Sequence, residues 1–225
     1  MGLSTARFTF IYDDPAECAA QMASPDSRSA RAFLSLLAGK IDALGLGKSV
    51  DAVNRTPLAL FPGAFNPLHD GHKGMADTAA EFLQCPVIFE LSIINVDKPP
   101  MDIGMTAERC AHFDQRPLCL TNAPTFLAKS QLFPGATFVV GVDTIVRIAD
   151  PHYYGGERAR DGALEAIGKA GSRFLVFGRH DGTEFRSLTD VALVSILAEL
   201  CDEVPESMFR QDISSTELRR PAADQ

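Results

Sequence analysis

Residues 61–75, FPGAFNPLHDGHKGM, join an apolar run to a helical pattern. The run that leads into this stretch, residues 58–61 (LALF), predicts a short buried strand. Residues 71–84 place apolar side chains at helical spacing, and Pro62-Gly63 between the two segments is a turn former. The stretch therefore predicts a strand, a loop and a helix start, an arrangement in which backbone N–H groups and the helix dipole can bind phosphate.

Two histidines lie three positions apart at this predicted helix start. If the helix begins near Asp70, His69 and His72 project from its first turn toward one point. Gly63 lacks the Cβ that would keep a ligand away from the backbone. Imidazoles beside a helix N-terminus form a donor cluster suited to a polyphosphate. The residue types alone leave two interpretations open, a phosphate site and an ordinary surface turn.

Composition limits the possible partners. The net charge of −8 argues against nonspecific nucleic-acid binding, which needs a basic face. No apolar run approaches the roughly 20 residues of a membrane span, and the N-terminus lacks the apolar segment of a secretory signal. The five cysteines form no CxxC motif and no cluster with histidine, which indicates reduced thiols and argues against structural zinc. We therefore expect a cytoplasmic protein with no nucleic-acid partner, no membrane partner and no metal bound by protein ligands.

The pattern changes at about residue 55. Residues 1–55 predict a strand at 8–12, a helix after Asp26 or Ser27 as N-cap, and a linker from residue 48. We expect this part to be a helical N-terminal appendage that packs on the main domain or on a partner. Residues 56–225 predict the main domain.

Strands and helices alternate in this main domain. Such alternation predicts an α/β fold, a Rossmann-like, doubly wound parallel sheet of about five strands. Ligands of such sheets bind at the carboxyl ends of the strands, where the strand order reverses. If strands 58–61 and 136–140 are neighbours, the loops at 63–72 and 141–144 line one crevice. The expected strands are 58–61, 86–94, 118–121, 136–140, 173–177 and 201–204, and the expected helices are 71–84, 106–115 with Thr106 as N-cap, 126–132, 142–149, 159–170 and 188–199.

A second motif, ISSTELRR at 213–220, places hydroxyl residues before a helical turn. Ser214 or Ser215 can cap that helix, and the hydroxyl and N–H groups together form another anion cradle. Arg219 lies about one turn further, on a face that can return to the same anion. Taken alone, the motif fits an ordinary capped helix with solvated arginines better than an anion site.

Together the two motifs resemble a known superfamily. GAFNPLHDGH at 63–72 resembles the GxFNPxHxGH signature of the HIGH-type nucleotidylyltransferases. ISSTELR at 213–219 resembles the ISSTxIR signature of its adenylyltransferase branch, chiefly nicotinamide- and nicotinate-mononucleotide adenylyltransferases. Segments such as ELSIINVDKPP and FLVFGR look like a cytidylyltransferase-like group found behind a CinA-like domain, so the resemblance covers about residues 57–220.

The resemblance implies a reaction in NAD biosynthesis. ATP, accompanied by Mg²⁺, would give an adenylyl group to a small phosphorylated substrate, nicotinamide or nicotinate mononucleotide, with release of pyrophosphate. Tyr153 and Tyr154 would replace the tryptophan on which that branch stacks the pyridine ring, since this chain has no tryptophan. The implied residues are His69, His72 and Arg219 for catalysis; Gly63, Ala64, Phe65, Gly141, Asp143, Arg179, Ile213, Ser214, Ser215 and Thr216 for the nucleotide; and Lys98, Arg109, Tyr153 and Tyr154 for the acceptor.

Other interpretations stay open. A cytidylyltransferase that uses CTP and a phosphorylated alcohol shares the first motif, although its usual RTEGISTT segment is missing here. Pantetheine-phosphate adenylyltransferases are a third option, but they are usually shorter. A catalytically silent protein could keep the pocket and only bind nucleotide. The sequence also leaves open a homo-oligomer.

Overall fold

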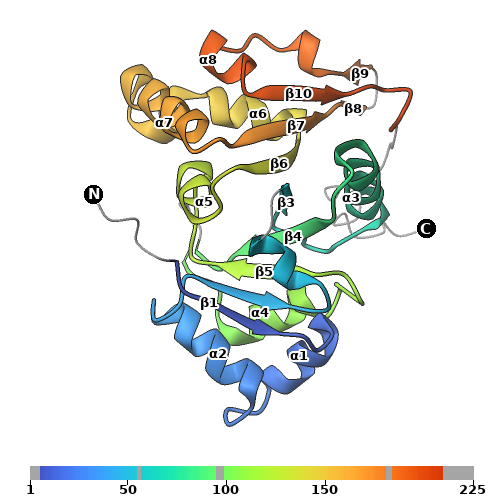
Figure 1. Ribbon diagram of the computed structural model, residues 1–225, viewed down its shortest axis with the longest axis vertical. Coiled ribbons are helices and arrows are strands. Elements are labelled where there is room, and N and C mark those ends of the chain that lie inside the picture. The colour runs from blue at the N-terminus through green and yellow to red at the C-terminus, as the bar shows by residue number, and fades with distance from the viewer. Residues whose placement is uncertain (1–5, 55–56, 95–98, 181–183, 210–225) are drawn as a thin grey trace, which may run out of the picture.

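A mixed sheet of eight strands forms the centre of the molecule (Figure 1). The computed structural model describes residues 6–54, 57–94, 99–180 and 184–209. The strand order is β1-β2-β5-β4-β3-β6-β7-β10, and all neighbouring pairs are parallel except β2 with β5. The strands are β1 (Phe8–Ile11), β2 (Ala43–Leu46), β3 (Leu58–Pro62), β4 (Val87–Ser92), β5 (Leu118–Thr121), β6 (Ala136–Gly141), β7 (Arg173–Phe177) and β10 (Cys201–Val204).

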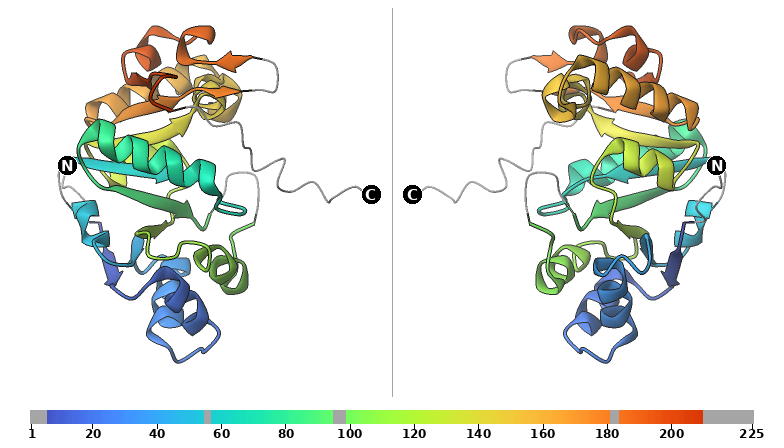
Figure 2. Two further views of the ribbon diagram at one scale, coloured as in Figure 1. Left: turned by 90° about the vertical axis from the view of Figure 1, so that its right-hand side faces the viewer. Right: turned by 90° about the vertical axis from the view of Figure 1, so that its left-hand side faces the viewer.

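Helices cover both faces of this sheet, as Figure 2 shows. One core lies under α1 to α4 and the other under α5 to α8, because side chains of each buried strand alternate between the two faces. The Rossmann-like, doubly wound α/β fold is therefore confirmed. The helices are α1 (Pro15–Met22), α2 (Arg28–Leu37), α3 (Asp70–Leu83), α4 (Ile103–Cys110), α5 (Phe126–Leu132), α6 (Val142–Ala149), α7 (Glu157–Lys169) and α8 (Ser195–Ala198), with short 3₁₀ turns η1 (Val50–Asn54), η2 (Pro151–Tyr154) and η3 (Leu188–Asp190).

The strand order reverses between β3 and β6. These two strands pair in parallel, with Leu58 opposite Ala136 and Leu60 opposite Phe138. From β3 the sheet continues outward through β4 and β5, and from β6 it continues through β7 and β10. The strands expected at 58–61 and 136–140 are therefore neighbours. The loops that follow them leave from the same edge of the sheet, which we call the carboxyl edge, where β3, β6 and β7 end.

The N-terminal region differs from the expected helical appendage, and the sheet is larger than about five strands. In the N-terminal region, the strand expected from residue 8 and the Ser27 cap of α2 are confirmed. However, residues 43–46 form β2 rather than the end of a helix, and all four are buried. Their backbone is hydrogen-bonded to β1 on one side and β5 on the other, so long-range pairing overrides the local helical spacing. The division of the chain near residue 55 stays a prediction.

Two expected helices also need correction. The helix expected at 106–115 begins at Ile103, because Asp102 rather than Thr106 is its N-cap and accepts the Met105 N–H at 2.7 Å. The single helix expected at 188–199 is instead η3 and α8, separated by an extended segment. Ser187 and Asp190 close a capping box around η3, after which Val191 is extended.

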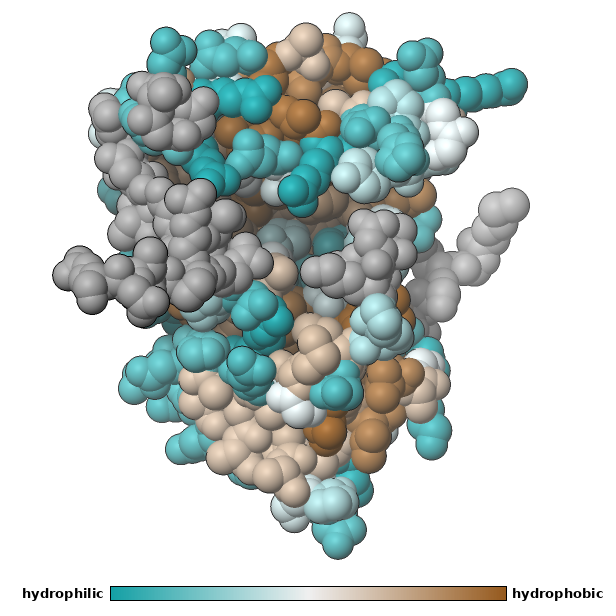
Figure 3. All heavy atoms as spheres, turned by 180° about the vertical axis from the view of Figure 1, so that it is seen from behind, coloured by the Kyte–Doolittle hydropathy of each residue, from teal (hydrophilic) through white to brown (hydrophobic). Residues whose placement is uncertain are grey.

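Among the described residues, no helix is long and apolar enough to cross a membrane. Large apolar side chains are exposed on several elements, and Figure 3 shows apolar surface at both ends of the molecule with polar groups around it. Scattered exposed hydrophobic residues are normal for a protein surface. The exposed examples are Tyr12, Leu34, Leu37, Phe82, Met105, Tyr153 and Met208.

Candidate functional site

The histidine pair lies at the start of α3, directly after the loop that follows β3. His69 is the N-cap residue, and its Nδ1 accepts the Gly71 N–H at 3.1 Å. The Nδ1 of His72 accepts the His69 N–H at 3.4 Å. The two rings stack with centroids 3.7 Å apart and an angle of 28° between their planes. Since Nδ1 is an acceptor in both rings, each neutral imidazole carries its proton on Nε2 and is a hydrogen-bond donor there.

Both imidazoles are held in the neutral form. Burial, with a smaller contribution from neighbouring His69, lowers the pKa of His72 to about 4. Burial also lowers the pKa of His69, opposed by the charge of Asp70. At neutral pH the pair therefore offers N–H groups without a net positive charge.

Aromatic rings fix the orientation of His72. Its ring packs edge-on against Phe61 and Phe65, with centroids 5.9 and 5.1 Å away. Phe65 in turn packs against Phe89 and Phe113, and only 2% of Phe65 is exposed. Phe65 was expected to face the nucleotide, but its side chain points into the core. Only its backbone is available to a ligand, and its ring positions His72 instead.

Gly63 has a packing role besides the nucleotide contact that was expected of it. A Cβ placed there would lie 2.6 to 2.9 Å from the Phe65 ring, so the missing side chain makes room for that ring. At Gly141, which ends β6, an added Cβ meets nothing within 4 Å. The two glycines of the carboxyl edge therefore differ in what a methyl group would disturb.

These glycines give a matched pair of variants. We expect Gly63→Ala to displace Phe65 and to lower the free energy of unfolding by about 1–3 kcal/mol, as overpacking does. Gly141→Ala should leave stability nearly unchanged, because its backbone angles (φ −84°, ψ 159°) suit alanine and the space is open. Urea unfolding of both variants checks this. Equal stability losses in the two variants would contradict the role given to Gly63.

The second loop joins β6 to α6 and carries Asp143. Its Oδ2 lies 2.6 Å from Nη1 of Arg179, which follows β7. Gly141 pairs with Phe177 in the sheet, which brings the ends of β6 and β7 side by side. The structure thus brings together three residues that were expected to contact the nucleotide.

Arg109 reaches the first loop from α4. Its Nη1 donates to the carbonyl oxygen of Ala64 at 2.7 Å, across 45 positions of sequence. Its Nε is buried and has no hydrogen-bond partner among the described residues. Arg109 and Ala64 therefore meet in the histidine loop.

The remaining expected residues are not joined to this group. Tyr153 packs edge-on against its neighbour His152 and is 51% exposed. Tyr154 is half-buried, and burial raises its pKa while Arg160 opposes the shift. These contacts are local to the segment after α6, so the stacking role of the tyrosines stays a prediction. Lys98, Ile213, Ser214, Ser215, Thr216 and Arg219 lie outside the described residues.

Sequence reasoning missed the aromatic support under His72. Phe61 and Phe89 occupy paired positions on adjacent strands and stack with centroids 5.5 Å apart. Their positions on apolar strands were visible, but the turn that points Phe65 toward them was not. Phe65 adopts a positive φ of 42°, which residue identity alone does not predict.

The neutral state of His72 has a consequence for stability. Its pKa is about 4 in the folded chain against 6.5 ordinarily, so unfolding takes up a proton between these values. The contribution of the neutral imidazole to the free energy of unfolding is complete above pH 6.5 and is lost progressively as the pH falls from 6.5 through 4, roughly 3 kcal/mol at most. The measurement is the free energy of unfolding of wild type minus that of His72→Asn across this range. A difference that does not change with pH would contradict a buried, neutral His72.

Fold and loop together define a doubly wound α/β protein with a strand–loop–helix unit of the phosphate-binding type at its switch point. A sequence model of the cytidylyltransferase-like family matches residues 60–221. This is well over half of the chain, which therefore belongs to that family, and the membership supports a nucleotidyltransferase activity in general. A search of curated proteins finds no match.

Proposed function

We propose that this protein transfers an adenylyl group from ATP to a phosphate monoester, nicotinamide or nicotinate mononucleotide, and so forms a dinucleotide. The observation that carries the proposal is the stacked histidine pair, neutral and with Nε2–H donors, at the start of α3 on the carboxyl edge. Family membership supports the general reaction. The adenylyl donor and the acceptor come from the resemblance of the two motifs.

The chemistry asks for charge stabilisation rather than a strong base. An oxygen of the acceptor phosphate bonds to the α-phosphorus of ATP, the bond from that phosphorus to the bridging oxygen breaks, and pyrophosphate leaves. His72 would donate its Nε2–H to an α-phosphate oxygen of ATP, and His69 would contact the ATP where its α- and β-phosphates meet. A neutral imidazole donates a hydrogen bond and keeps its proton, which suits a step that needs alignment and electrostatic support.

The C-terminal motif would hold the leaving phosphates. The family match extends to residue 221 and so includes Ser214, Ser215, Thr216 and Arg219. The described chain ends at Phe209, whose ring packs on Phe177 at the carboxyl edge with centroids 5.1 Å apart. Five residues reach about 17 Å, whereas β7 and β3, two strands apart, are separated by roughly 10 Å. This span allows the contact that we propose between the motif and the histidine loop.

The acceptor would lie on the α4 side of the loop. Arg109 is already tied to Ala64 there, and Lys98 precedes α4 in sequence. Asp143 would face the ribose or the pyridine side, and Tyr153 and Tyr154 would stack on the ring. Mg²⁺ would accompany ATP and be held chiefly by phosphate oxygens. That suits a carboxyl edge at which Asp143 already pairs with Arg179.

The setting of the proposed reaction is the cytoplasm. All five cysteines are free thiols, which supports a reducing compartment. We also propose a relation to chains with a CinA-like N-terminal domain, whose place residues 1–55 would take. We propose no nucleic-acid or membrane partner.

One observation favours a second candidate. The matching family is described as cytidylyltransferase-like, so CTP with a phosphorylated alcohol is the alternative pair of substrates. Pyrophosphate release with ATP or CTP against a panel of phosphate monoesters separates the candidates. Release with ATP and a pyridine mononucleotide supports the proposal, and release only with CTP selects the alternative. Nucleotide binding without release from any pair would point to a silent binding protein.

A further inference from the structure

The hairpin that follows β7 carries two arginines, and only the first of them was expected to contact the nucleotide. Its strands are β8 (Arg179–His180) and β9 (Phe185–Arg186), and they pair antiparallel with Arg179 opposite Arg186. Residues directly opposite in such a ladder project from the same face, with Cβ atoms about 4.5–5.5 Å apart. Arg179 reaches Asp143 from this face, so Arg186 lies on the face turned toward the start of α6.

Packing holds the hairpin against the carboxyl edge. A Cβ on Gly178 would lie 2.3 Å from the Phe185 ring and 3.0 Å from the Arg186 carbonyl oxygen, so the returning strand lies directly on Gly178. Behind the hairpin, the Leu188 N–H donates to Glu203 of β10 at 2.8 Å. In Figure 2 three elements project from the same side of the sheet: the hairpin, helix α4 and the loop that follows β3. The place of Arg186 is therefore set by the fold.

On the hairpin side of this edge, the described charges compensate a bound polyanion only in part. Arg179 already forms an ion pair with Asp143, with Nη1 2.6 Å from Oδ2, and both histidines are neutral. The chain as a whole carries −8. A nucleoside triphosphate brings several negative charges, so a site that holds it needs cations that are not already paired.

Arg186 is such a cation. Among the described residues no ion pair joins it to a carboxylate, and its side chain is exposed. Hydrogen bonds from Ser187 lower the pKa of Asp190, and the nearby charge of Arg186 adds to this effect. That carboxylate, however, already accepts the N–H and the hydroxyl of Ser187, at 2.8 and 2.7 Å. Two arginines directly opposite each other repel, and a bound anion between them would remove that cost.

We propose that Arg186 binds the triphosphate of the nucleotide substrate, with Arg179 held beside it by Asp143. The inference rests on the proposed function and adds a binding residue to the same site. Arg186 contacts the leaving phosphates and takes no part in bond making, so it should act on the affinity for a triphosphate and hardly on that for a monophosphate.

The test is calorimetric binding of inorganic tripolyphosphate, a probe without a base, to the full chain. We expect Arg186→Gln to weaken binding about tenfold or more, as loss of a charged hydrogen bond does, and Arg186→Lys to weaken it less. Arg31→Gln on α2 is the matched control, since it removes one exposed arginine from a helix far from the hairpin in Figure 1. Nicotinamide mononucleotide is titrated in parallel to report on the acceptor phosphate.

Each outcome decides the matter. Weaker tripolyphosphate binding in Arg186→Gln alone, with the mononucleotide unaffected, supports the inference. Equal affinities of Arg186→Gln and Arg31→Gln for tripolyphosphate, or a loss confined to the mononucleotide, would overturn it and leave the proposed function standing. A wild-type chain that binds no tripolyphosphate would overturn both. If Arg186→Gln does not fold, Arg186→Ala, which also removes the charge, decides by the same comparison.

Discussion

Replacing His72 with asparagine should lower turnover by about 10²–10³-fold, the usual effect of removing one donor that stabilises transition-state charge. The asparagine Oδ1 takes the place of Nδ1, so it can still accept the His69 N–H that His72 accepts at 3.4 Å. What the variant loses is the Nε2–H. The reduction should fall on kcat, because the donor acts on charge that develops at the reacting phosphorus.

Glutamine at position 72 is the matched control for this variant. Its amide nitrogen reaches farther, to about the place of Nε2, so His72→Gln should retain more activity than His72→Asn. Both variants lose ring contacts with Phe61 and Phe65, and we expect melting temperatures to fall by only a few degrees. Turnover of His72→Asn within tenfold of wild type would remove His72 from the reaction.

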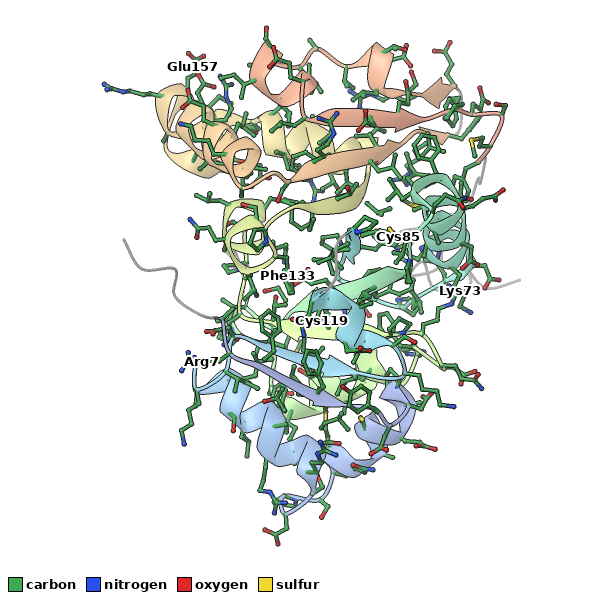
Figure 4. The ribbon with its side chains drawn as sticks, viewed as in Figure 1. Arg7, Lys73, Cys85, Cys119, Phe133 and Glu157 are labelled. Carbon is green, nitrogen blue, oxygen red and sulfur yellow. The ribbon has the colours of Figure 1, made fainter. Side chains whose placement is uncertain are left out.

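Replacing Lys129 with methionine should lower the free energy of unfolding by about 3–5 kcal/mol, because it leaves a buried carboxylate without its partner. Lys129 on α5 lies 2.7 Å from Glu90 of β4, and both side chains are buried. Its Nζ also donates to the Ala123 carbonyl at 2.6 Å, and the Thr121 hydroxyl donates to Glu90. Cys119, which Figure 4 labels, is the register partner of Glu90 on β5 and so lies beside this group of buried polar side chains.

This buried pair also supports the functional loop. The backbone carbonyl of Glu90 accepts the Gly63 N–H at 3.0 Å, so disorder at Glu90 would reach the loop after β3. The control is Lys169→Met, which breaks an exposed pair with Glu165 one helical turn away and should cost less than about 1 kcal/mol. Urea unfolding measures both. Equal losses would show that burial does not determine the strength of the Lys129–Glu90 pair.

Much of the fold was predictable because local signals agreed with the long-range pairing. The apolar run of β3, the turn after it and the spacing of α3 all indicated the element that the structure shows. Ser27 and Thr125 cap helices, as short polar residues before apolar periods do. For residues 43–46 the local pattern was wrong, because it indicated a helix where the structure has a strand. Their helical spacing was local, whereas their strand depends on β1 and β5, which lie far away in sequence.

The sequence indicated which residue types form the candidate site, but it did not indicate where their side chains point. The motif named Phe65, but only the fold shows that its ring supports His72. Contacts between distant segments, such as Asp143 with Arg179 across 36 positions, follow from the neighbouring ends of β6 and β7. The hairpin with Arg186 has strands of two residues, too short to leave a periodic signal.

The proposed reaction makes the α-phosphorus the point of attack, and isotopic labelling tests that most directly. The chain is incubated with each acceptor of the phosphate-monoester panel and with ATP or CTP labelled at the α or the γ position. We expect the α label to enter the acceptor product and the γ label to appear in pyrophosphate. A γ label in the product, a γ label released as inorganic phosphate, or no transfer with any pair would contradict it.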